Sequence, residues 1–329
     1  MAENLLEIEK LKIIYRRREK RFLALDCVNL DLKEGEVLGV VGESGSGKST
    51  LGLSIMRLLP PQARIKNGEI FFKGKNICKI NERKFNREMR GKEITYIPQN
   101  PQSSLNPVFK VGRQLKDIIK YRAQENFQGQ DINKAAVEIM TKMGIADAEK
   151  RLDEYPHQFS GGMKQRVLLS MAFVTNPALL IADEPTTALD VTVEAQILGL
   201  LADLIKEYRS SIIYITHDLG VVSEIADRVA VFYAGRVIEL NNRYNIFNNP
   251  KHPYTEALIN CLPGDKQSEK LNVIPGEIPD LSDLPGGCNF HPRCKYAKER
   301  CKNEKPEFFE LENGGRTACF YHEEVGRYE

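Results

Sequence analysis

The nine residues GESGSGKST (42–50) have the types and spacing needed to bind phosphate groups. They fit the pattern G-x-x-x-x-G-K-[ST], in which glycines let the backbone curl until successive N–H groups point inward. A short apolar run precedes them and a helical pattern follows, so the positive end of a helix adds to the attraction. A plain glycine-rich turn is the alternative, and this context argues against it. The residues expected to contact a nucleotide are Gly42, Ser44, Gly45, Ser46, Gly47, Lys48, Ser49 and Thr50.

Two neighbouring carboxylates supply chemistry that phosphate binding alone lacks. The segment LLIADEP (179–185) is an apolar strand that ends in Asp183 and Glu184. Lys48 is expected to bridge the β- and γ-phosphates, while Ser49 and Asp183 hold Mg²⁺, the latter through water. Glu184 lies where a general base could polarise an attacking water. Strand ends are often acidic because they face solvent, but together with the phosphate loop these acids predict catalysis.

Further polar residues accompany the two motifs. FSGGMKQR (159–166) offers a serine hydroxyl and two glycine N–H groups at the start of a helix, which makes a second anion-binding surface. A glutamine and a histidine end two other strands, and ALD (188–190) follows the acidic pair. Taken singly, the serine could be a helix cap, the histidine a satisfied polar group and the glutamine a loop amide. The residues expected to join the site are Gln99, Ser160, Gly161, Gly162, Asp190 and His217.

The elements that must position these residues alternate between strand and helix. Strands are expected within 5–15 and 25–41 and at 178–183, 211–216 and 229–234, and helices at 49–59, within 111–150, at 163–174 and 192–207, and from 219. This alternation predicts an α/β protein with a mostly parallel sheet and a helical subdomain inserted at about 100–172. Prolines become frequent and periodicity fades after about residue 245, so we expect two domains, 1–245 and 246–329.

Composition limits the class of protein and its compartment. The chain has 329 residues, of which 42% are apolar and 28% charged, as in ordinary soluble globular proteins. A formal net charge of +2 gives no argument for nucleic acid as a partner. Neither a signal peptide nor an uninterrupted apolar run of about 18 residues is expected. We therefore expect a cytosolic protein whose seven cysteines form no disulfide framework.

In this order the motifs resemble the ATP-binding subunits of ABC transporters, over residues 5 to about 240. The resemblance implies the ABC-type fold, with an antiparallel β subdomain beside the parallel sheet. It implies Mg-dependent ATP hydrolysis between two subunits packed head to tail, each ATP lying between one phosphate loop and the partner's SGG motif. Gln99 would contact Mg²⁺ and sense the γ-phosphate, and His217 would position the water. Tyr15 would stack on adenine, unless it is a strand-end core residue and Phe22 takes that place.

Within this family several motifs are typical of the branch that imports peptides and nickel. FSGGMKQR, PQSSLNP (101–107) and NPKHPYTEALINCLP (249–263) resemble importers of dipeptides and oligopeptides, and Met163 in place of the usual glutamine resembles the first of their two paired ATPases. The resemblance implies a second homologous ATPase, two membrane permease subunits, an extracytoplasmic solute-binding protein and a peripheral place at the cytoplasmic face of the membrane. An importer of nickel or another solute, and a soluble ABC ATPase with a regulatory iron–sulfur centre, are the alternatives.

Four cysteines gather near the end of the chain, at Cys288, Cys294, Cys301 and Cys319. Four thiolates can hold zinc or an iron–sulfur cluster, and the C-x₂₋₄-C knuckle typical of structural zinc is missing. The resemblance implies a 4Fe–4S cluster. Zinc and unligated cysteines are the alternatives, and His291 and His322 are expected to be surface residues rather than substitute ligands. A small, loop-rich iron–sulfur domain pinned by its metal centre is therefore expected. Because the nucleotide domain has its own core, ATP binding is expected not to depend on this tail.

Overall fold

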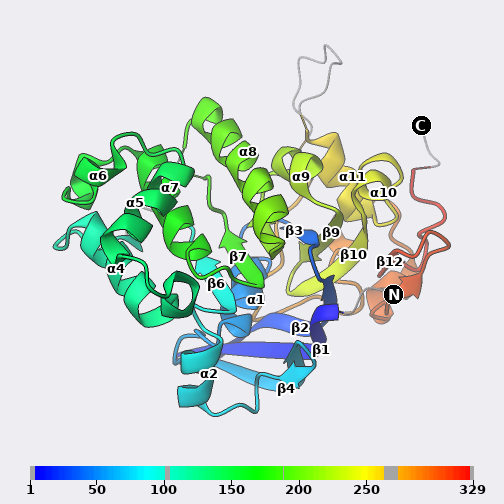
Figure 1. Ribbon diagram of the computed structural model, residues 1–329. Coiled ribbons are helices and arrows are strands. Elements are labelled where there is room, and N and C mark those ends of the chain that lie inside the picture. Colours follow the sequence, from blue (N-terminus) through cyan, green and yellow to red (C-terminus); the bar gives the residue numbers. More distant parts are fainter. Residues whose placement is uncertain (1–3, 101–103, 188, 263–272, 327–329) are drawn as a thin grey trace. The chain divides into compact units, whose positions relative to one another are not determined.

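A computed structural model describes residues 4–100, 104–187, 189–262 and 273–326 (Figure 1). The first three residues of the PQSSLNP motif, Ala188 of the ALD motif and residues 263–272 and 327–329 of the tail lie outside the described residues. The chain divides into two compact units, each of which we describe by itself. We call residues 33–35 and 79–214 the helical unit, and residues 4–32, 36–78 and 215–329 the β-rich unit.

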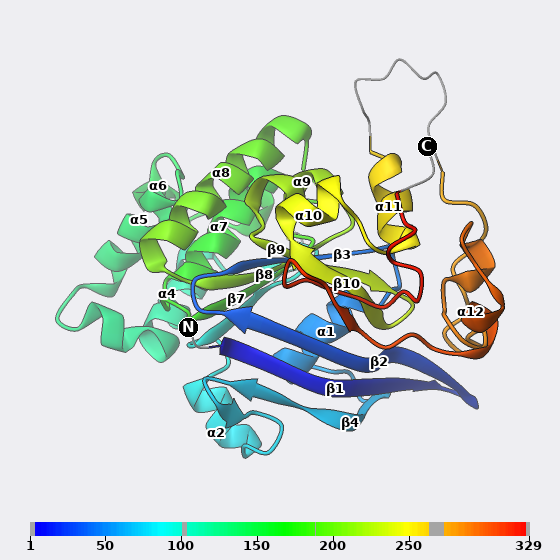
Figure 2. The same ribbon diagram turned by 90° about the vertical axis from the view of Figure 1, so that its right-hand side faces the viewer.

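The β-rich unit contains a four-stranded sheet with the order β2-β1-β4-β5 (Figure 2). Its strands are β1 (Asn4–Arg17), β2 (Lys20–Lys33), β4 (Ala63–Phe72) and β5 (Lys75–Asn76), and β4 is antiparallel to both β1 and β5. A bulge in β1 at Lys10, whose φ is 46°, shifts the register and brings Ile8, Leu11 and Ile13 alike into the core. The expected antiparallel subdomain is present, although the sequence pattern had indicated no strand at β4.

A second set of strands in this unit has the order β11-β12-β10-β9-β3. Strand β3 (Val37–Val41) is buried throughout and runs parallel to β9 (Arg228–Tyr233), and β10 (Arg236–Asn242) is antiparallel to β9. The phosphate loop connects β3 to α1 (Lys48–Ile55), as expected from the sequence. The remaining elements of the unit are α9 (Leu219–Ile225), α10 (Arg243–Asn248), α11 (Pro253–Asn260), α12 (Glu299–Asn303), β11 (Phe309–Glu310) and β12 (Arg316–Thr317).

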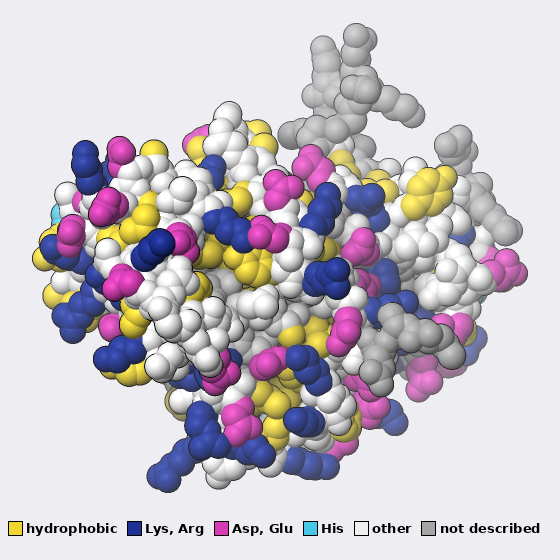
Figure 3. All heavy atoms as spheres, in the orientation of Figure 1, with side chains coloured by type: hydrophobic (Ala, Val, Ile, Leu, Met, Phe, Trp, Pro, Cys, Tyr) yellow, Lys and Arg dark blue, Asp and Glu magenta, His cyan; other side chains and the backbone are white. Residues whose placement is uncertain are grey.

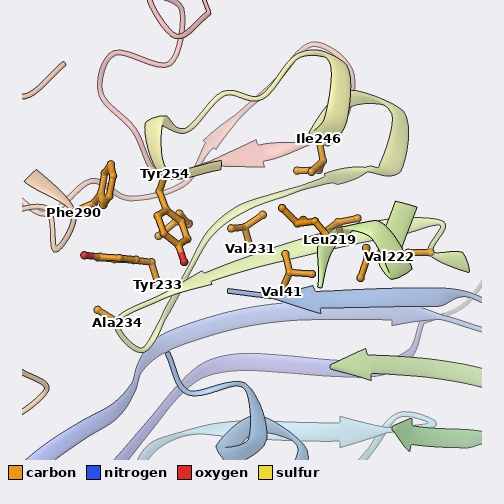
Figure 4. Close-up of a cluster of buried hydrophobic side chains, with 12 residues drawn as sticks. Val41, Leu219, Val222, Val231, Tyr233, Ala234, Ile246, Tyr254 and Phe290 are labelled. Atoms are coloured by element: carbon orange, nitrogen blue, oxygen red, sulfur yellow. The ribbon is translucent and has the colours of Figure 1, made fainter. Parts of the chain in front are cut away.

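The C-terminal tail does not pack as a separate body. Strand β12 extends the second sheet by pairing with β10, and Arg316 of β12 forms an ion pair with Asp31 of β2. Figure 4 shows Phe290 beside Tyr233 and Tyr254, with ring centroids 5.2 and 5.4 Å away. The tail shares its core with the segment that carries the phosphate loop. The domain boundary at residue 245 stays a prediction, since both of its sides lie in this one unit.

The helical unit contains the expected helical insertion (Figure 1). Its elements are α2 (Glu82–Glu88), β6 (Ile94–Ile97), α4 (Val111–Arg122), α5 (Ile132–Lys142), α6 (Ala148–Arg151), α7 (Gly161–Phe173), β7 (Leu179–Asp183), α8 (Val191–Tyr208) and β8 (Ser211–Thr216), whose last two residues belong to the β-rich unit. Leu115, Ile119, Ile139 and Met140 are buried at helical spacing on α4 and α5, which pack together. Strands β6 and β7 are parallel.

Charge on the molecular surface is mixed. On the face shown in Figure 3, basic and acidic side chains are interspersed. This mixture on the visible face is in keeping with the small net charge of +2. Among the described residues, no helix combines the length and the apolar character that crossing a membrane requires.

Candidate nucleotide site and cysteine cavity

The lysine of the phosphate loop is buried and hydrogen-bonded to the loop's own backbone. Lys48 is 4% exposed, and its Nζ donates to the carbonyl oxygens of Gly42 at 2.7 Å and Glu43 at 2.9 Å. Ser46 Oγ is buried and has no hydrogen-bond partner among the residues that the structure describes. A buried hydroxyl without a partner is costly, and a bound phosphate oxygen would satisfy it. The loop therefore fits the phosphates that its sequence predicts.

Glycine is required at two positions of this loop. Gly42 has a φ of 150°, and a Cβ there would lie 2.2 Å from the carbonyl oxygen of Phe232. Gly47, which caps α1, has a φ of 106°, and its Cβ would lie 2.5 Å from the carbonyl oxygen of Ala24. Both contacts are with backbone, which cannot rotate away as a side chain would. These glycines let the loop curl tightly against its neighbouring strands.

Asp183 ends β7 in the helical unit and is 3% exposed. The Tyr96 hydroxyl from β6 donates to Asp183 Oδ2 at 2.6 Å. Burial, and after it the Asp183 carboxylate, raises the pKa of Tyr96, so the hydroxyl keeps its proton and remains a donor. Tyr96 was missed by the sequence analysis. No sequence signal marks Tyr96, because the parallel pairing of β6 with β7 that places it beside Asp183 is a tertiary contact.

Glu184 is held in an unusual conformation beside Gln99. Its φ is 46°, a left-handed value that is uncommon for residues other than glycine. Its Oε2 accepts hydrogen bonds from Gln99 Nε2 at 2.8 Å and from Thr187 Oγ1 at 3.1 Å. The structure therefore brings two of the predicted catalytic residues together. Thr187 is an addition that the sequence reasoning missed, although it lies only three residues further along the chain.

The SGG motif starts helix α7. Ser160 caps the helix by accepting a hydrogen bond from the Met163 N–H at 3.3 Å, so the alternative role of this serine as a helix cap is observed. Asp190 caps α8 in the same way, accepting from the Val193 N–H at 3.0 Å. A Cβ on Gly162 would lie 2.6 Å from Val193 Cγ1, so this glycine lets the two helix starts pack closely. Capping leaves the first N–H groups of α7 directed outward, as anion binding requires.

His217 and Tyr15 belong to the β-rich unit. His217 follows β8 directly and its side chain is exposed. Tyr15 lies near the end of β1, opposite Ala63 of β4, and is partly exposed. Partial exposure of an aromatic ring at a strand end suits stacking, and it suits equally a residue at the edge of the core. The role of Tyr15 therefore stays a prediction.

The four tail cysteines line one small cavity of about 20 Å³, enough for about one water molecule. Burial, and after it the other thiols of the group, raises the pKa of Cys294 to about 11 and that of Cys319 to about 12. These two thiols are therefore protonated at neutral pH, and their thiolates need a cationic group beside them to form.

The structure gathers these donors without arranging them as a metal site. Among the described residues, no three His, Cys, Asp or Glu side chains are set to hold a metal ion. His291 and His322 turn a ring nitrogen to the backbone carbonyls of Cys288 and Cys319, at 2.9 and 3.0 Å. The predicted iron–sulfur domain is therefore supported only as four cysteines that share one cavity.

The fold and these motifs define the class of protein as a phosphate-loop ATPase. The family described as ABC transporter matches residues 25–187, and the family described as the oligopeptide/dipeptide transporter C-terminal region matches residues 238–301. Among solved structures, the dimeric post-hydrolysis state of the ATP-binding cassette MJ0796 with ADP and Pi has a TM-score of 0.64 and 26% identity, covering 72% of this chain and 98% of that one.

Curated relatives match over nearly the full length of the chain. The oligopeptide transport ATP-binding protein AppD of Bacillus subtilis is 43% identical over 324 residues, covering 98% of each chain. The dipeptide transport ATP-binding protein DppD of Escherichia coli is 42% identical over 318 residues, covering 96% of each. The chain belongs to the ATP-binding, ATP-hydrolysing subunits of ABC transporters and carries the C-terminal region of their oligopeptide/dipeptide branch.

Proposed function

We propose that this protein binds and hydrolyses ATP to energise the uptake of dipeptides or oligopeptides through a membrane ABC importer. The observation that carries the proposal is the match of residues 238–301 to the C-terminal region of peptide transporters, beyond the ATPase core that ABC proteins share. Similarity to relatives named for dipeptide and oligopeptide transport supports the same substrate class. A peripheral position on the cytoplasmic side of the membrane, on two permease subunits supplied by a solute-binding protein, belongs to this proposal.

Deleting the gene is expected to lower ATP-dependent uptake of a labelled tripeptide or dipeptide at least about tenfold. ABC import stops when the subunit that hydrolyses ATP is missing. Wild-type protein supplied in trans should restore uptake, and a variant that cannot hydrolyse ATP should not. Uptake of labelled nickel serves as the specificity control. Peptide uptake that is unchanged by the deletion, together with lost nickel uptake, would replace the proposed substrate.

In the proposed reaction, a water oxygen attacks the γ-phosphorus of ATP as the bond to the β–γ bridging oxygen breaks. Glu184 takes the proton from that water, and ADP leaves with the released bridging oxygen. Lys48 binds the phosphates, while Ser49, Asp183 and Gln99 are the residues that would hold Mg²⁺, which neutralises the developing charge when bound. His217 positions the water against the γ-phosphate. The distances of Gln99 and Tyr96 to the two acids support this assignment.

Each active site is proposed to need a second subunit. Ser160, Gly161 and Gly162 would present the start of α7 to the γ-phosphate held by a partner's phosphate loop, with Asp190 beside it. The exposed Ser160 and the close packing of Gly162 support this role, because a bulkier residue there would push the helix start away from α8. A homologous but different ATPase is the proposed partner. Sedimentation of the purified chain with ATP, alone and mixed with that partner, distinguishes a homodimer from a heterodimer.

We also propose that the four tail cysteines hold a 4Fe–4S cluster. The support is chemical: four thiol groups of the tail line one cavity, and the raised pKa values of Cys294 and Cys319 call for a cationic group beside them. When bound, a cluster would supply that charge and four iron–thiolate bonds. The cavity of about 20 Å³ would have to widen to admit it.

Serine substitution at Cys288, Cys294, Cys301 or Cys319 is expected to lower the iron content of anaerobically purified protein from about four to below one per chain. The broad absorbance near 400 nm should fall with it, because a serine oxygen is a poor ligand for a cluster iron. The same change at Cys27, which is exposed on β2, or at Cys78 is the matched control and should leave iron unchanged. One zinc per chain in colourless wild-type protein would favour a zinc site instead.

A further inference from the structure

Glu43, the second residue of the phosphate loop, is held by two side chains from the C-terminal part of the chain. The Arg293 guanidinium donates from Nη1 to both carboxylate oxygens of Glu43, at 3.0 and 3.3 Å. The Glu43 backbone N–H donates to the Tyr254 hydroxyl at 3.0 Å. All three residues belong to the β-rich unit. Together these contacts fix both the side chain and the main chain of Glu43.

The side chain of Arg293 is buried rather than lying on the surface. Its side chain is 5% exposed, against 24% for Glu43. Its Nε donates to the Pro275 carbonyl at 2.9 Å, and the guanidinium lies over the rings of Tyr233 and Phe290, 5.8 and 5.9 Å from their centroids. A buried guanidinium with this many partners has one available position, so the carboxylate that it binds is fixed as well.

Tyr254 is also fixed by its surroundings. It is fully buried in the first turn of α11, where Pro253 occupies the first helical position and the His252 ring caps the helix by accepting from the Tyr254 N–H at 3.0 Å. The carboxylate of Glu239 on β10 accepts from the N–H groups of Lys251 and His252, at 2.7 and 2.9 Å. The segment KHPY (251–254), which follows β10 in the chain, thus places the Tyr254 hydroxyl at the phosphate loop.

The backbone at Glu43, which Tyr254 holds, also contacts the lysine of the phosphate loop. The Glu43 carbonyl accepts from Lys48 Nζ at 2.9 Å, so the same residue contacts the lysine that is proposed to bind phosphate. The Glu43 N–H that Tyr254 holds shares its peptide unit with the Gly42 carbonyl, which accepts from Lys48 Nζ at 2.7 Å. A rotation of this peptide unit would redirect both groups, and with them the lysine. Without Arg293, the Glu43 carboxylate would also stand near the phosphates of a nucleotide with its charge uncompensated.

We propose that Arg293 and Tyr254 are positioning residues for the phosphate loop, through which the C-terminal tail sets the affinity for nucleotide. The inference rests on the proposed nucleotide site and adds a role for the tail within it. Arg293 directly precedes Cys294, which lines the cysteine cavity, so a rearrangement of that cavity would reach Glu43 through one residue. ATP binding then depends on the tail, contrary to the expectation from sequence.

The test is the equilibrium affinity of the purified full-length chain for a fluorescent ATP analogue. Arg293→Gln and Glu43→Gln are each expected to weaken binding about tenfold, the effect of breaking one charge-assisted contact that is largely buried. The double variant should bind no more weakly than the weaker single variant, because both changes remove the same contact. Arg293→Lys, which keeps the charge, should recover part of the loss. Lys295→Gln removes a charge from the same segment, where Lys295 pairs with Glu256, and should bind as the wild type does.

Tyr254→Phe, which removes one hydroxyl, is expected to weaken binding about threefold and covers the case in which the Arg293 variants do not fold. Additive losses in the double variant, or variants that melt at lower temperature yet bind the analogue as tightly as the wild type, would overturn the inference. Failure of the wild-type chain itself to bind the analogue would instead remove the proposed nucleotide site. The two failures are therefore distinguishable in one experiment.

Discussion

Replacing Glu184 by Gln is expected to lower the rate of ATP hydrolysis by about 10²- to 10⁴-fold while leaving ATP binding close to wild type. The amide cannot take the proton of the attacking water, whereas the groups proposed to hold the phosphates and Mg²⁺ are untouched. Gln99 and Thr187 both donate to Glu184 Oε2, and the Gln amide oxygen can still accept from them, so the local structure should persist. The measurement is phosphate release by the assembled transporter, with fluorescent ATP binding measured in parallel.

Glu149→Gln is the matched control for this variant, because it makes the same chemical change on an exposed position of α6. Its hydrolysis rate should equal that of the wild type. Because ATP is bound without being cleaved, the Glu184 variant should also accumulate ATP-bound dimers in the presence of the partner subunit. Turnover near the wild-type rate would remove Glu184 from the role of base.

Replacing Lys48 by Ala is expected to weaken nucleotide binding itself by about 100-fold, through the loss of a charged hydrogen-bond donor to the phosphates. Hydrolysis should disappear with it at nucleotide concentrations that saturate the wild type. Lys48 also bonds to the carbonyls of Gly42 and Glu43, so the empty loop should be looser as well. Titration with a fluorescent ATP analogue gives the affinity, and thermal melting without nucleotide shows whether the unit still folds.

Lys75→Ala, on the exposed strand β5 of the same unit, provides the matched loss of one positive charge. Its affinity for the analogue should be unchanged, because it lies outside the loop. The contrast separates a specific phosphate contact from a general effect of net charge. A Lys48 variant that binds as tightly as the control would show that nucleotide is held elsewhere.

Several strands, helix starts and the phosphate loop can be predicted from the sequence, because each depends on a short pattern of neighbouring residues. The short apolar, β-branched run at 37–41, followed by glycines, predicts β3 and the phosphate loop, and both occur where expected. The apolar run before Asp183 likewise predicts β7. The helix starts at Ser160 and Asp190 follow from their capping side chains. In each case the residues that decide the conformation lie within a few positions of one another.

Only the tertiary structure decided which distant residues support the site. Arg293 reaches Glu43 across 250 positions and Tyr96 reaches Asp183 across 87, and no periodicity or spacing encodes such pairs. The tail reads as a separate appendage because it is rich in proline and poor in regular pattern, yet it packs with the unit that carries the phosphate loop. A segment with too little apolar surface for its own core must bury that surface against a neighbour, and composition does not say which neighbour. The sequence by itself therefore determined the class of chemistry, whereas packing placed Arg293 and Tyr254 of the tail in contact with Glu43 of the phosphate loop.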